Sequence, residues 1–382
     1  MVKLRDVGKI ITGNTPKTSE KENYESNDIC FVKPSDIEDD SISYIEETEN
    51  FIAECAREKA RILPVNSVLV TCIGIIGKIG INKVECAFNQ QINAIVPNEE
   101  ICLAQYLAYA IKSKKFLLQD IANAPVVPIL NKTQFADVEI KIVDLKEQER
   151  IVHRLAKVEA LIDQRKQQFQ KLDELVKARF VEMFGDEFSE FNKLGNLASV
   201  TGGLTKNSKR KDLELKLPYL RVANVYFNKI DTKEILEIGL TEEEYKKTVL
   251  EYGDLLFVEG NGSPEQIGRV AVWRDEVVNC VHQNHIIKAR FDKCVMHPMF
   301  VMHYFMSVQG REQIKSKAVS TSGLHTLSVS KISDLDVPIV EIALQNKFVY
   351  FVEQINKSKL SVQKSLDKLE ILKKALMQKY FG

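Results

Sequence analysis

The longest regular pattern of apolar positions lies in two stretches without glycine or proline, residues 147–184 and 342–381. In both, apolar residues recur at steps of four and three, the heptad spacing that keeps one stripe of a helix against a partner helix. The pattern predicts two long helices in a coiled coil. Their seam is formed by Ile151, Leu155, Val158, Ile162, Phe169, Leu172 and Val176 of the first stretch, and by Phe348, Val352, Ile355, Val362, Leu366, Leu369 and Leu376 of the second.

The interruptions of the two stripes are complementary. Arg165 and Arg179 interrupt the first stripe. At the corresponding positions the second stripe has Val362 and Leu376, while Lys359 interrupts the second. We therefore expect the two helices to pair with each other. The order globule, helix, globule, helix favours an antiparallel orientation, which puts one globule at each end and a pseudo-two-fold axis between the halves. At about 1.5 Å per residue such a helix is roughly 55 Å long. A purely structural strut remains an alternative for this rod.

The remainder of the chain has a different pattern. Short strand-like runs, such as ICFVK, SVLVTCI and GKIGINKV, are separated by Gly, Asn and Pro turns, and a helical stretch follows each set. Strands followed by helices predict an α+β class with mostly antiparallel pairing. No glycine-rich fingerprint follows a first strand, which argues against a dinucleotide-binding domain.

The chain contains two copies of one unit of about 190 residues. Phe184-Gly185 recurs at the end as Phe381-Gly382, and the same displacement brings Gln148 onto Gln345. Further upstream, CFVKPSDI matches PYLRVANV and Cys86 falls on Cys280. The repeat predicts four parts, namely a first globule 1–144, a first long helix 145–185, a second globule 186–341 and a second long helix 342–382.

Composition narrows the function classes. The 382 residues carry 53 basic and 53 acidic side chains, so the chain as a whole is not an electrostatic nucleic-acid binder. Its seven cysteines form no C-x-x-C pair, as expected of buried thiols in a reducing compartment. Neither a secretory signal nor a membrane-length apolar run is evident, and a cytoplasmic location is expected.

Catalytic motifs are weak. The sequence lacks the Pro-Pro loop of an adenine methyltransferase and the phosphate-binding loop of a translocase. Asp137, Glu139 and Lys141 nominally fit a metal-dependent nuclease, but their alternation with Val and Ile favours the solvent face of an edge strand. His282 and His285, beside Cys280, match no tetrahedral metal spacing, and a polar turn is the better interpretation. We therefore predict no catalytic residue and no metal site.

A family resemblance emerges from the combination of these features. The run LKEQERIVHRLAKVEALID, closing on FVEMFGD before a fresh KLG start, resembles the specificity subunits of type I restriction-modification systems. The segments IITGNTP and LPYLRVANV are similar to the start and first strand of their target-recognition domains. Two details depart from the family pattern. No proline precedes the first helix, and Gln345-Asn346 replaces Gln148-Glu149 in the second copy.

The resemblance implies a function and partners. In that family each globule reads one half of a bipartite DNA sequence, the helices set the spacing, and two methyltransferase subunits dock on the helical region, with restriction subunits joining through them. No cofactor is expected in this chain, whereas S-adenosylmethionine, ATP and Mg²⁺ are expected in the partners. The diverged loops predict an asymmetric target. Two other classes stay open, a nuclease and a coiled-coil adaptor with two protein-binding globules.

DNA contacts are expected in loops that carry amides and basic groups, since amides bind adenine and Arg or Lys binds guanine, while glycine lets backbone approach phosphate. The repeat nominates equivalent loops in both globules. In the first the candidates are Gly13, Asn14, Thr15, Lys17, Lys33, Ser35, Lys78, Asn89, Gln90 and Gln91. In the second they are Thr205, Lys206, Asn207, Lys209, Arg210, Lys211, Arg221, Asn224, Asn261, Ser263, Arg269, Gln283, Asn284 and His285. Among them, KNSKRK is the strongest candidate for phosphate contact.

Overall fold

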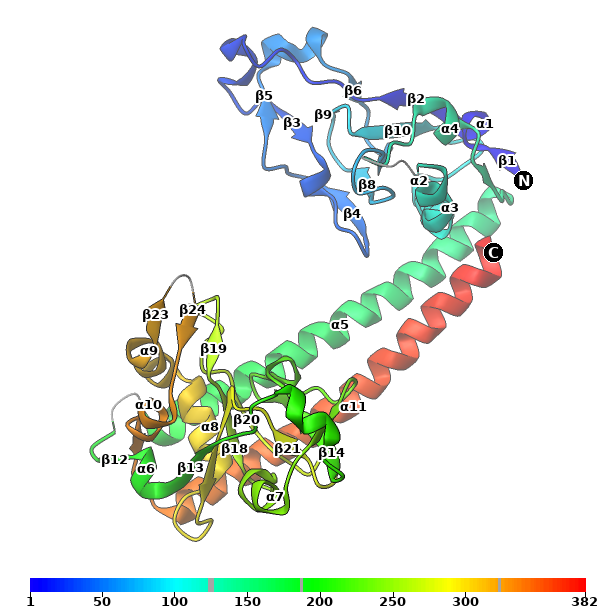
Figure 1. Cartoon of the computed structure of the whole chain (residues 1–382). Coiled ribbons are helices and arrows are strands. Elements are labelled where there is room, and N and C mark those ends of the chain that lie inside the picture. The colour runs from blue at the N-terminus through cyan, green and yellow to red at the C-terminus, as the bar shows by residue number, and fades with distance from the viewer. Residues whose placement is uncertain (123–126, 186–187, 322–323) are drawn as a thin grey trace. The chain divides into compact units, whose positions relative to one another are not determined.

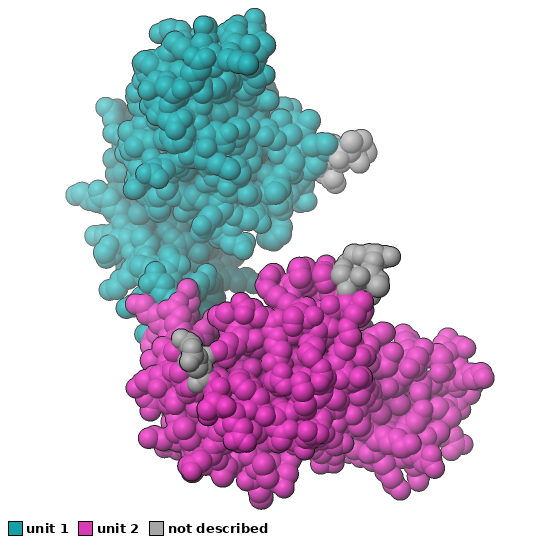
Figure 2. Space-filling view, turned by 90° about the vertical axis from the view of Figure 1, so that its left-hand side faces the viewer, with its two compact units in different colours: residues 1–167, 363–382 teal, residues 168–362 magenta. Residues whose placement is uncertain are grey.

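The computed structural model describes residues 1–122, 127–185, 188–321 and 324–382. The chain divides into two compact units (Figures 1 and 2), residues 1–167 with 363–382, and residues 168–362. Each unit therefore consists of one globule and a segment of each long helix. The position at which we expect the second globule to begin, residue 186, lies outside the described residues.

The two long helices are α5 (Leu145–Phe184) and α11 (Ile342–Phe381). In unit 1 the start of α5 meets the end of α11, where Arg154 Nη1 donates to Tyr380 Oη at 2.9 Å. In unit 2 the end of α5 meets the start of α11, where the rings of Phe180 and Phe348 lie 5.3 Å apart. Within each unit the helices thus run antiparallel, as the order of globules and helices predicts.

The predicted seam lies at this helix pair. Nine of its side chains are buried and the others are half-buried, the latter being Phe169, Leu172, Leu366, Leu369 and Leu376. The interruptions are also accommodated. Arg179 lies 5.6 Å from the ring centre of Phe351, and Lys359 lies 5.5 Å from that of Phe169 while it pairs with Asp173. Such cation–π contacts let a cation occupy a seam position without leaving its charge uncompensated.

Unit 1 contains three small sheets. The largest has the order β2 (Gly8–Thr12), β10 (Ile92–Pro97), β7 (Val68–Thr71), β8 (Ile79–Asn82) and β4 (Ile42–Ile45). The second has the order β5 (Phe51–Ile52), β3 (Ile29–Val32), β9 (Cys86–Phe88) and β6 (Ile62–Leu63). The third joins β1 (Val2–Lys3) to β11 (Glu139–Ile140). The helices are α1 (Leu4–Val7), α2 (Ala104–Ser113), α3 (Lys115–Ile121) and α4 (Lys132–Ala136), with 3₁₀ turns η1 (Lys21–Tyr24), η2 (Pro34–Asp36) and η3 (Glu54–Lys59).

Unit 2 is built on the same plan. One sheet orders β13 (Ala198–Gly202), β22 (Ile286–Phe291), β18 (Leu255–Val258) and β20 (Val270–Val272), and a second orders β17 (Leu236–Gly239), β14 (Lys216–Leu220) and β21 (Val281–His282). Smaller pairs are β12 (Phe191–Lys193) with β25 (Asp336–Pro338), β15 (Val225–Tyr226) with β16 (Lys229–Ile230), and β19 (Gly260–Asn261) with β24 (Leu324–Thr326) and β23 (Val319–Thr321). The helices are α6 (Leu194–Leu197), α7 (Glu242–Thr248), α8 (Pro298–Met306), α9 (Val308–Lys317) and α10 (Val329–Ser333), with η4 (Ser208–Asp212) and η5 (Val222–Asn224).

Most strand pairs in both units are antiparallel, which confirms the predicted α+β class; the parallel pairs are β3 with β9, β4 with β8 and β14 with β21. The largely buried helices α2 and α8 pack on their sheets and form the centre of each core. Across the described part of the chain, no helix combines the length and apolar character needed to cross a membrane.

A fully buried glutamine fastens each long helix to its globule. Gln148 accepts a hydrogen bond from the Leu103 amide at 2.9 Å and donates to the carbonyls of Ile101 and Val143. Gln345 makes the equivalent contacts, since it accepts from the His297 amide at 2.8 Å, just before α8, and donates to the carbonyls of Val295 and Val340. The residue that differs between the copies, Glu149 or Asn346, is exposed, so this departure from the family pattern leaves the fastening unchanged.

Replacing Gln148 with alanine should lower the free energy of unfolding by about 2–3 kcal/mol, since three partly buried backbone groups lose their partner. Urea unfolding measures the loss, with Glu149→Ala as the exposed control. Equal stabilities of the two variants would contradict the fastening role.

Candidate nucleic-acid interface

In unit 1 three of the predicted loops converge. Strands β3 and β9 are parallel, so their carboxyl ends lie at one edge, and the Asn89 amide donates to the Val32 carbonyl at 3.1 Å. Gly13, which follows β2, lies so close that a Cβ built on it would sit 2.0 Å from the Asn89 oxygen. We name residues 13–17, 33–36 and 89–91 the first turn cluster.

Several amides of this cluster are occupied by the protein itself. Asn14 donates to the Lys59 carbonyl at 2.7 Å and accepts from the Arg61 amide at 2.8 Å. Asn89 is buried and bonds to both the side chain and the amide of Gln91. These side chains shape the turns, which leaves a different set exposed, namely Thr15, Lys17, Ser35 and Gln90.

The exposed members form a small polar surface. Thr15 donates to Gln90 Oε1 at 2.6 Å, so two loops present one hydrogen-bonded pair. The side chain of Lys17 is 81% exposed and lies 3.9 Å from Glu20. A hydroxyl, an amide and a flexible cation together can contact base edges and phosphate.

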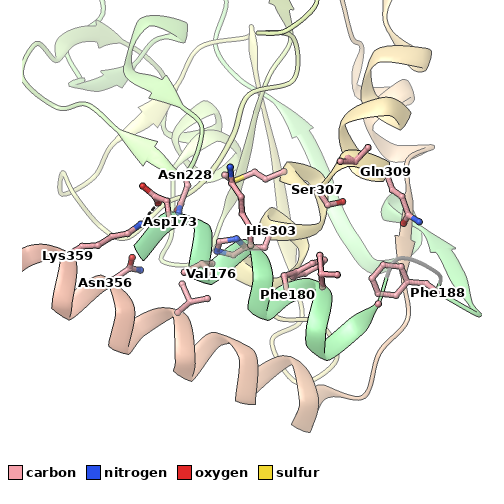
Figure 3. A pocket seen from close by; sticks show the side chains of 16 residues that line it. Asp173, Val176, Phe180, Phe188, Asn228, His303, Ser307, Gln309, Asn356 and Lys359 are labelled. Atoms are coloured by element: carbon pink, nitrogen blue, oxygen red, sulfur yellow. Dashed lines mark hydrogen bonds and ion pairs between the residues drawn. The ribbon is translucent and has the colours of Figure 1, made fainter. Parts of the chain in front are cut away.

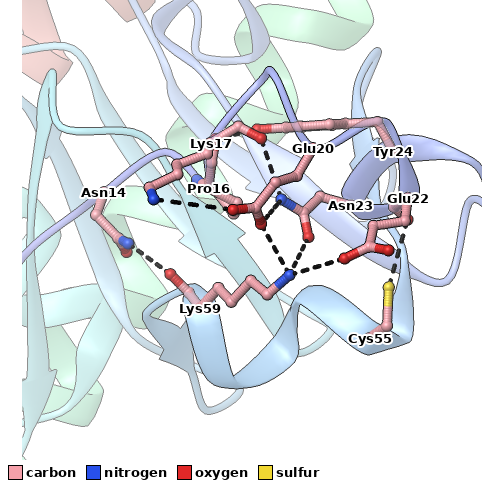
Figure 4. Close-up of polar contacts among 9 residues, drawn as sticks. All are labelled: Asn14, Pro16, Lys17, Glu20, Glu22, Asn23, Tyr24, Cys55 and Lys59. Atoms are coloured by element: carbon pink, nitrogen blue, oxygen red, sulfur yellow. Dashed lines mark hydrogen bonds and ion pairs between the residues drawn. The ribbon is translucent and has the colours of Figure 1, made fainter.

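An ion-pair cluster holds the segment that carries Lys17 (Figure 4). Lys59 donates to Glu20, Glu22 and Asn23, while Asn23 donates to the Lys17 carbonyl at 3.1 Å. The hydrogen bond from Lys59 lowers the pKa of Glu20. The charge of Lys59 is therefore balanced inside the cluster, whereas the Lys17 ammonium projects into solvent.

The predicted lysines Lys33 and Lys78 stabilise the turn after β3 by hydrogen bonds. Lys33 donates to Asn50 at 2.6 Å and stays half-buried. Lys78 donates to the carbonyls of Pro34 and Ile37 at 3.1 and 2.8 Å. The Lys78 ammonium thus fixes the backbone of η2 from the side of β8.

Unit 2 repeats this arrangement. Strands β14 and β21 are parallel, and the Gln283 amide donates to the Leu220 carbonyl at 3.0 Å. A Cβ on Gly203 would lie 2.1 Å from the His282 oxygen. Residues 203–205, 221–224 and 283–285 therefore form a second turn cluster at the position equivalent to the first.

Buried polar groups hold the turn after β14. Asn224 is buried, accepts from the Arg221 amide at 2.9 Å and donates to two carbonyls. Arg269 takes the place of Lys78. It donates to the Val222 carbonyl at 3.1 Å and lies 5.0 Å from the ring centre of Tyr226. Burial lowers the pKa of Arg269. Arg221 itself is partly exposed and pairs with Glu234 at 3.3 Å.

The basic run KNSKRK divides into an inward and an outward part. Arg210, with only 12% of its side chain exposed, donates to Glu244 at 2.8 and 2.9 Å and to the carbonyls of Thr205 and Gly239. This pairing lowers the pKa of Glu244 to about 2. The exposed members of the run are Lys206, Asn207, Ser208, Lys209 and Lys211, and Thr205 just before it is exposed as well, so these residues remain available to a phosphate backbone.

Replacing Arg210 with methionine should destabilise unit 2 by about 1–2 kcal/mol at neutral pH, because a bidentate, partly solvent-screened ion pair is lost. The pKa of Glu244 is depressed on folding, so the contribution is complete above about pH 4.5 and fades as the pH falls towards 2. Urea unfolding at pH 7 and pH 3 measures it. Lys209→Met is the exposed control, and an equal effect of both changes would contradict the inward role of Arg210.

The remaining candidates of unit 2 lie near the second turn cluster. Asn284 is half-buried, and its backbone N–H donates to the Leu204 carbonyl at 3.0 Å. His285 is exposed and bonds to Glu259 at 2.6 Å. Asn261 accepts from the Ser263 amide at 2.9 Å, which closes the loop after β19. Gln283, Asn284 and His285 thus sit together, while Asn261 and Ser263 belong to a neighbouring loop.

The structure also places the residues of the nuclease alternative. Asp137 pairs with Lys3 at 2.8 Å and Arg5 at 2.5 Å, while Glu139 and Lys141 are exposed at the edge of the β1–β11 pair. The second copy has equivalent ion pairs, in which Lys193 pairs with both Asp334 and Asp336. Among the described residues no cluster of metal-ligating side chains occurs.

Comparison with known proteins places this architecture. The profile described as the type I restriction modification DNA specificity domain matches residues 1–174. The MjaIX specificity subunit of Methanocaldococcus jannaschii is 26% identical, with 99% of this chain and 91% of that protein covered. The EcoKI specificity subunit of Escherichia coli is 24% identical, with 91% and 79% covered. The chain belongs to the type I restriction-modification specificity subunits.

Solved structures share the fold. The type I restriction-modification S subunit from M. genitalium aligns over 100% of this chain and 95% of its own at 13% identity, with a TM-score of 0.56. A chain from a study of assembly and conformational transition in a type I system aligns over 99% and 96% at 14% identity, with a TM-score of 0.60. As a specificity subunit, this chain is a non-catalytic, DNA sequence-recognition component.

Sequence reasoning missed some residues that shape the specificity subunit's turns. The Arg61 guanidinium donates to the Thr12 carbonyl, and Thr12 donates to Asn93 at 2.6 Å. Glu244, the partner of Arg210, is a further omission. These contacts join segments far apart in the chain, so no local motif marks them. Glu244 has one local signature, the Thr-x-x-Glu capping box that begins at Thr241. This signature predicts the start of α7 and says nothing about the ion pair with Arg210.

Proposed function

We propose that the first and second turn clusters each read one half of an asymmetric, bipartite double-stranded DNA target. The observation that carries this proposal is the duplicated geometry, in which a glycine abuts the end of a parallel strand pair in both units. The same backbone frame presents different side chains, since Asn89, Gln90 and Gln91 of unit 1 correspond to Gln283, Asn284 and His285 of unit 2. Different side chains on one frame select different bases.

Two methyltransferase subunits are proposed to dock on α5 and α11, with restriction subunits joining through them. The names of the relatives support this assignment in general, and they do not favour an adaptor without DNA specificity. S-adenosylmethionine, ATP and Mg²⁺ would then be held by the partners. With 53 basic and 53 acidic residues, this chain lacks a net charge of its own for phosphate, so the partners would supply part of the attraction.

A randomised DNA library, methylated by this chain together with its methyltransferase, tests the division of labour. Gln90→Ala should relax one half of the selected motif by roughly 1–3 kcal/mol at one base pair. Gln283→Ala should relax the other half, and Glu99→Ala, an exposed control, neither. Relaxation of the same half by both glutamine variants would contradict the proposal.

A further inference from the structure

Unit 2 contains a cavity of about 290 Å³ that the recognition function does not use (Figure 3). It lies between the last turns of α5, the first half of α11 and the junction of α8 with α9. Its wall is mostly apolar and includes Val176, Phe180, Met306 and Val352. Asn356 and the Asp173–Lys359 ion pair add polar groups.

A buried histidine faces this cavity. His303 is 8% exposed and lines the wall, and its Nε2 has no hydrogen-bond partner among the described residues. Its ring packs edge-on against Phe348, with the centres 5.2 Å apart. Burial lowers the pKa of His303 to about 3, so the ring is neutral at physiological pH. A buried polar atom without a partner is costly, and native proteins seldom keep one.

In the first copy of the repeat, other side chains occupy the positions equivalent to His303 and its neighbours. The displacement that brings Cys86 onto Cys280 brings Tyr109 onto His303. The displacement that brings Gln148 onto Gln345 relates Glu159 to Asn356 and Lys373 to Val176. In unit 1 Tyr109 donates to Glu159 at 2.5 Å, and Glu159 pairs with Lys373 at 2.8 Å. In this triad the Tyr109 hydroxyl has a hydrogen-bond acceptor and the Glu159 carboxylate has a cation beside it. In unit 2 all three members differ, and their replacements leave both space and an unpartnered nitrogen.

We propose that the cavity binds a small, uncharged aromatic molecule that bears one hydroxyl or N–H group, with its polar atom on His303 Nε2. Its volume lies at the lower end of ligand pockets, which span ~300–1,000 Å³, and therefore suits one or two rings rather than a nucleotide. Phe180 and the Met306 thioether offer favourable contacts to an aromatic ring. The apolar wall and the already paired Lys359 disfavour a charged ligand.

The test uses the full chain and two fluorinated probes observed by ¹⁹F NMR, 4-fluorophenol and 4-fluorotoluene. The two have nearly the same shape, but only the phenol carries a hydroxyl group, which can either donate to or accept from the imidazole. We expect the phenol to bind about five- to tenfold more tightly. In His303→Phe this difference should disappear, whereas Tyr109→Phe, at the equivalent position of unit 1, should keep it.

A second variant keeps the test informative if His303→Phe fails to fold. Val176→Phe fills the cavity and should abolish binding of both probes, and thermal unfolding reports whether each variant is folded. Equal affinities of the two probes, or no binding of either, would overturn the proposal. The same titration with the chain bound to its methyltransferase separates a free ligand from a partner side chain. Retained phenol binding supports the free ligand, and its loss assigns the cavity to the partner and overturns the proposal.

Discussion

Gly13→Ala is expected to disrupt the first turn cluster and to abolish recognition of one half of the DNA target. A Cβ at this position lies 2.0 Å from the Asn89 oxygen and 2.5 Å from the Phe88 oxygen. Both are backbone atoms beside the β3–β9 pairing, so they cannot rotate away as a side chain would. Forced separation of the strands should cost roughly 2–3 kcal/mol of unfolding free energy, the range of overpacking in a tight core. Methylation of the randomised library reports the lost half-site.

The repeat supplies a matched experiment in unit 2. The Cβ that Gly203→Ala adds would lie 2.1 Å from the His282 backbone oxygen, so this change should remove recognition of the other half of the DNA target. Its neighbour provides the control, because a Cβ on Gly202 meets only a methyl of Val329 at 3.6 Å. Gly202→Ala should therefore leave both stability and the motif intact. If Gly203→Ala retained the complete motif, the second turn cluster would not be the reading element.

Phe180→Ala should lower the free energy of unfolding of unit 2 by about 3–5 kcal/mol, the usual cost of deleting a buried phenylalanine. Phe180 is 5% exposed, and its ring centre lies 5.0 Å from Phe184, 5.8 Å from Phe300 and 5.3 Å from Phe348. It thereby joins α5, α8 and α11. The removed ring would also enlarge the neighbouring cavity, and that space would not be refilled.

Hydrogen exchange of backbone amides in α8 and in the first half of α11 measures this loss locally, since a two-unit chain need not unfold in one step. The control is Phe116→Ala, because Phe116 is 81% exposed and its removal should change stability by less than about 0.5 kcal/mol. Unchanged protection in Phe180→Ala would show that the aromatic cluster does not fasten the helices in unit 2.

The long helices could be predicted from the sequence because a heptad is a local signal. Residues four and three apart on a helix share a face whatever surrounds them, and the predicted seam residues are buried or half-buried. Phe180 escaped notice because it lies outside the strict heptad series. Its burial depends on Phe300 and Phe348, which are distant in sequence. The spacing of one helix cannot reveal such a cluster.

The candidate loops were easier to predict than the roles of their side chains. The repeat located equivalent loops, and the structure joins most of them into the two turn clusters. An amide or guanidinium, however, can bond to the protein's own carbonyls as well as to a base. Asn14, Asn89 and Arg210 bond to the protein itself. Lys59 and Glu244 lie within reach of Asn14 and Arg210 only after the chain folds, whereas Asn89 bonds to Gln91 two residues along the chain. Exposed neighbours such as Lys17 and Gln90 carry the surface chemistry.

Methylome sequencing of a methylation-deficient bacterial host tests the central claim most directly. The host would express the methyltransferase alone or together with this chain, with assembly of the complex verified by co-purification. The account predicts a new methyladenine motif in two unlike parts, separated by an unspecified spacer and present only when this chain is expressed. An assembled complex that yields the same methylation pattern with and without the chain would contradict its role as the sequence-recognition subunit.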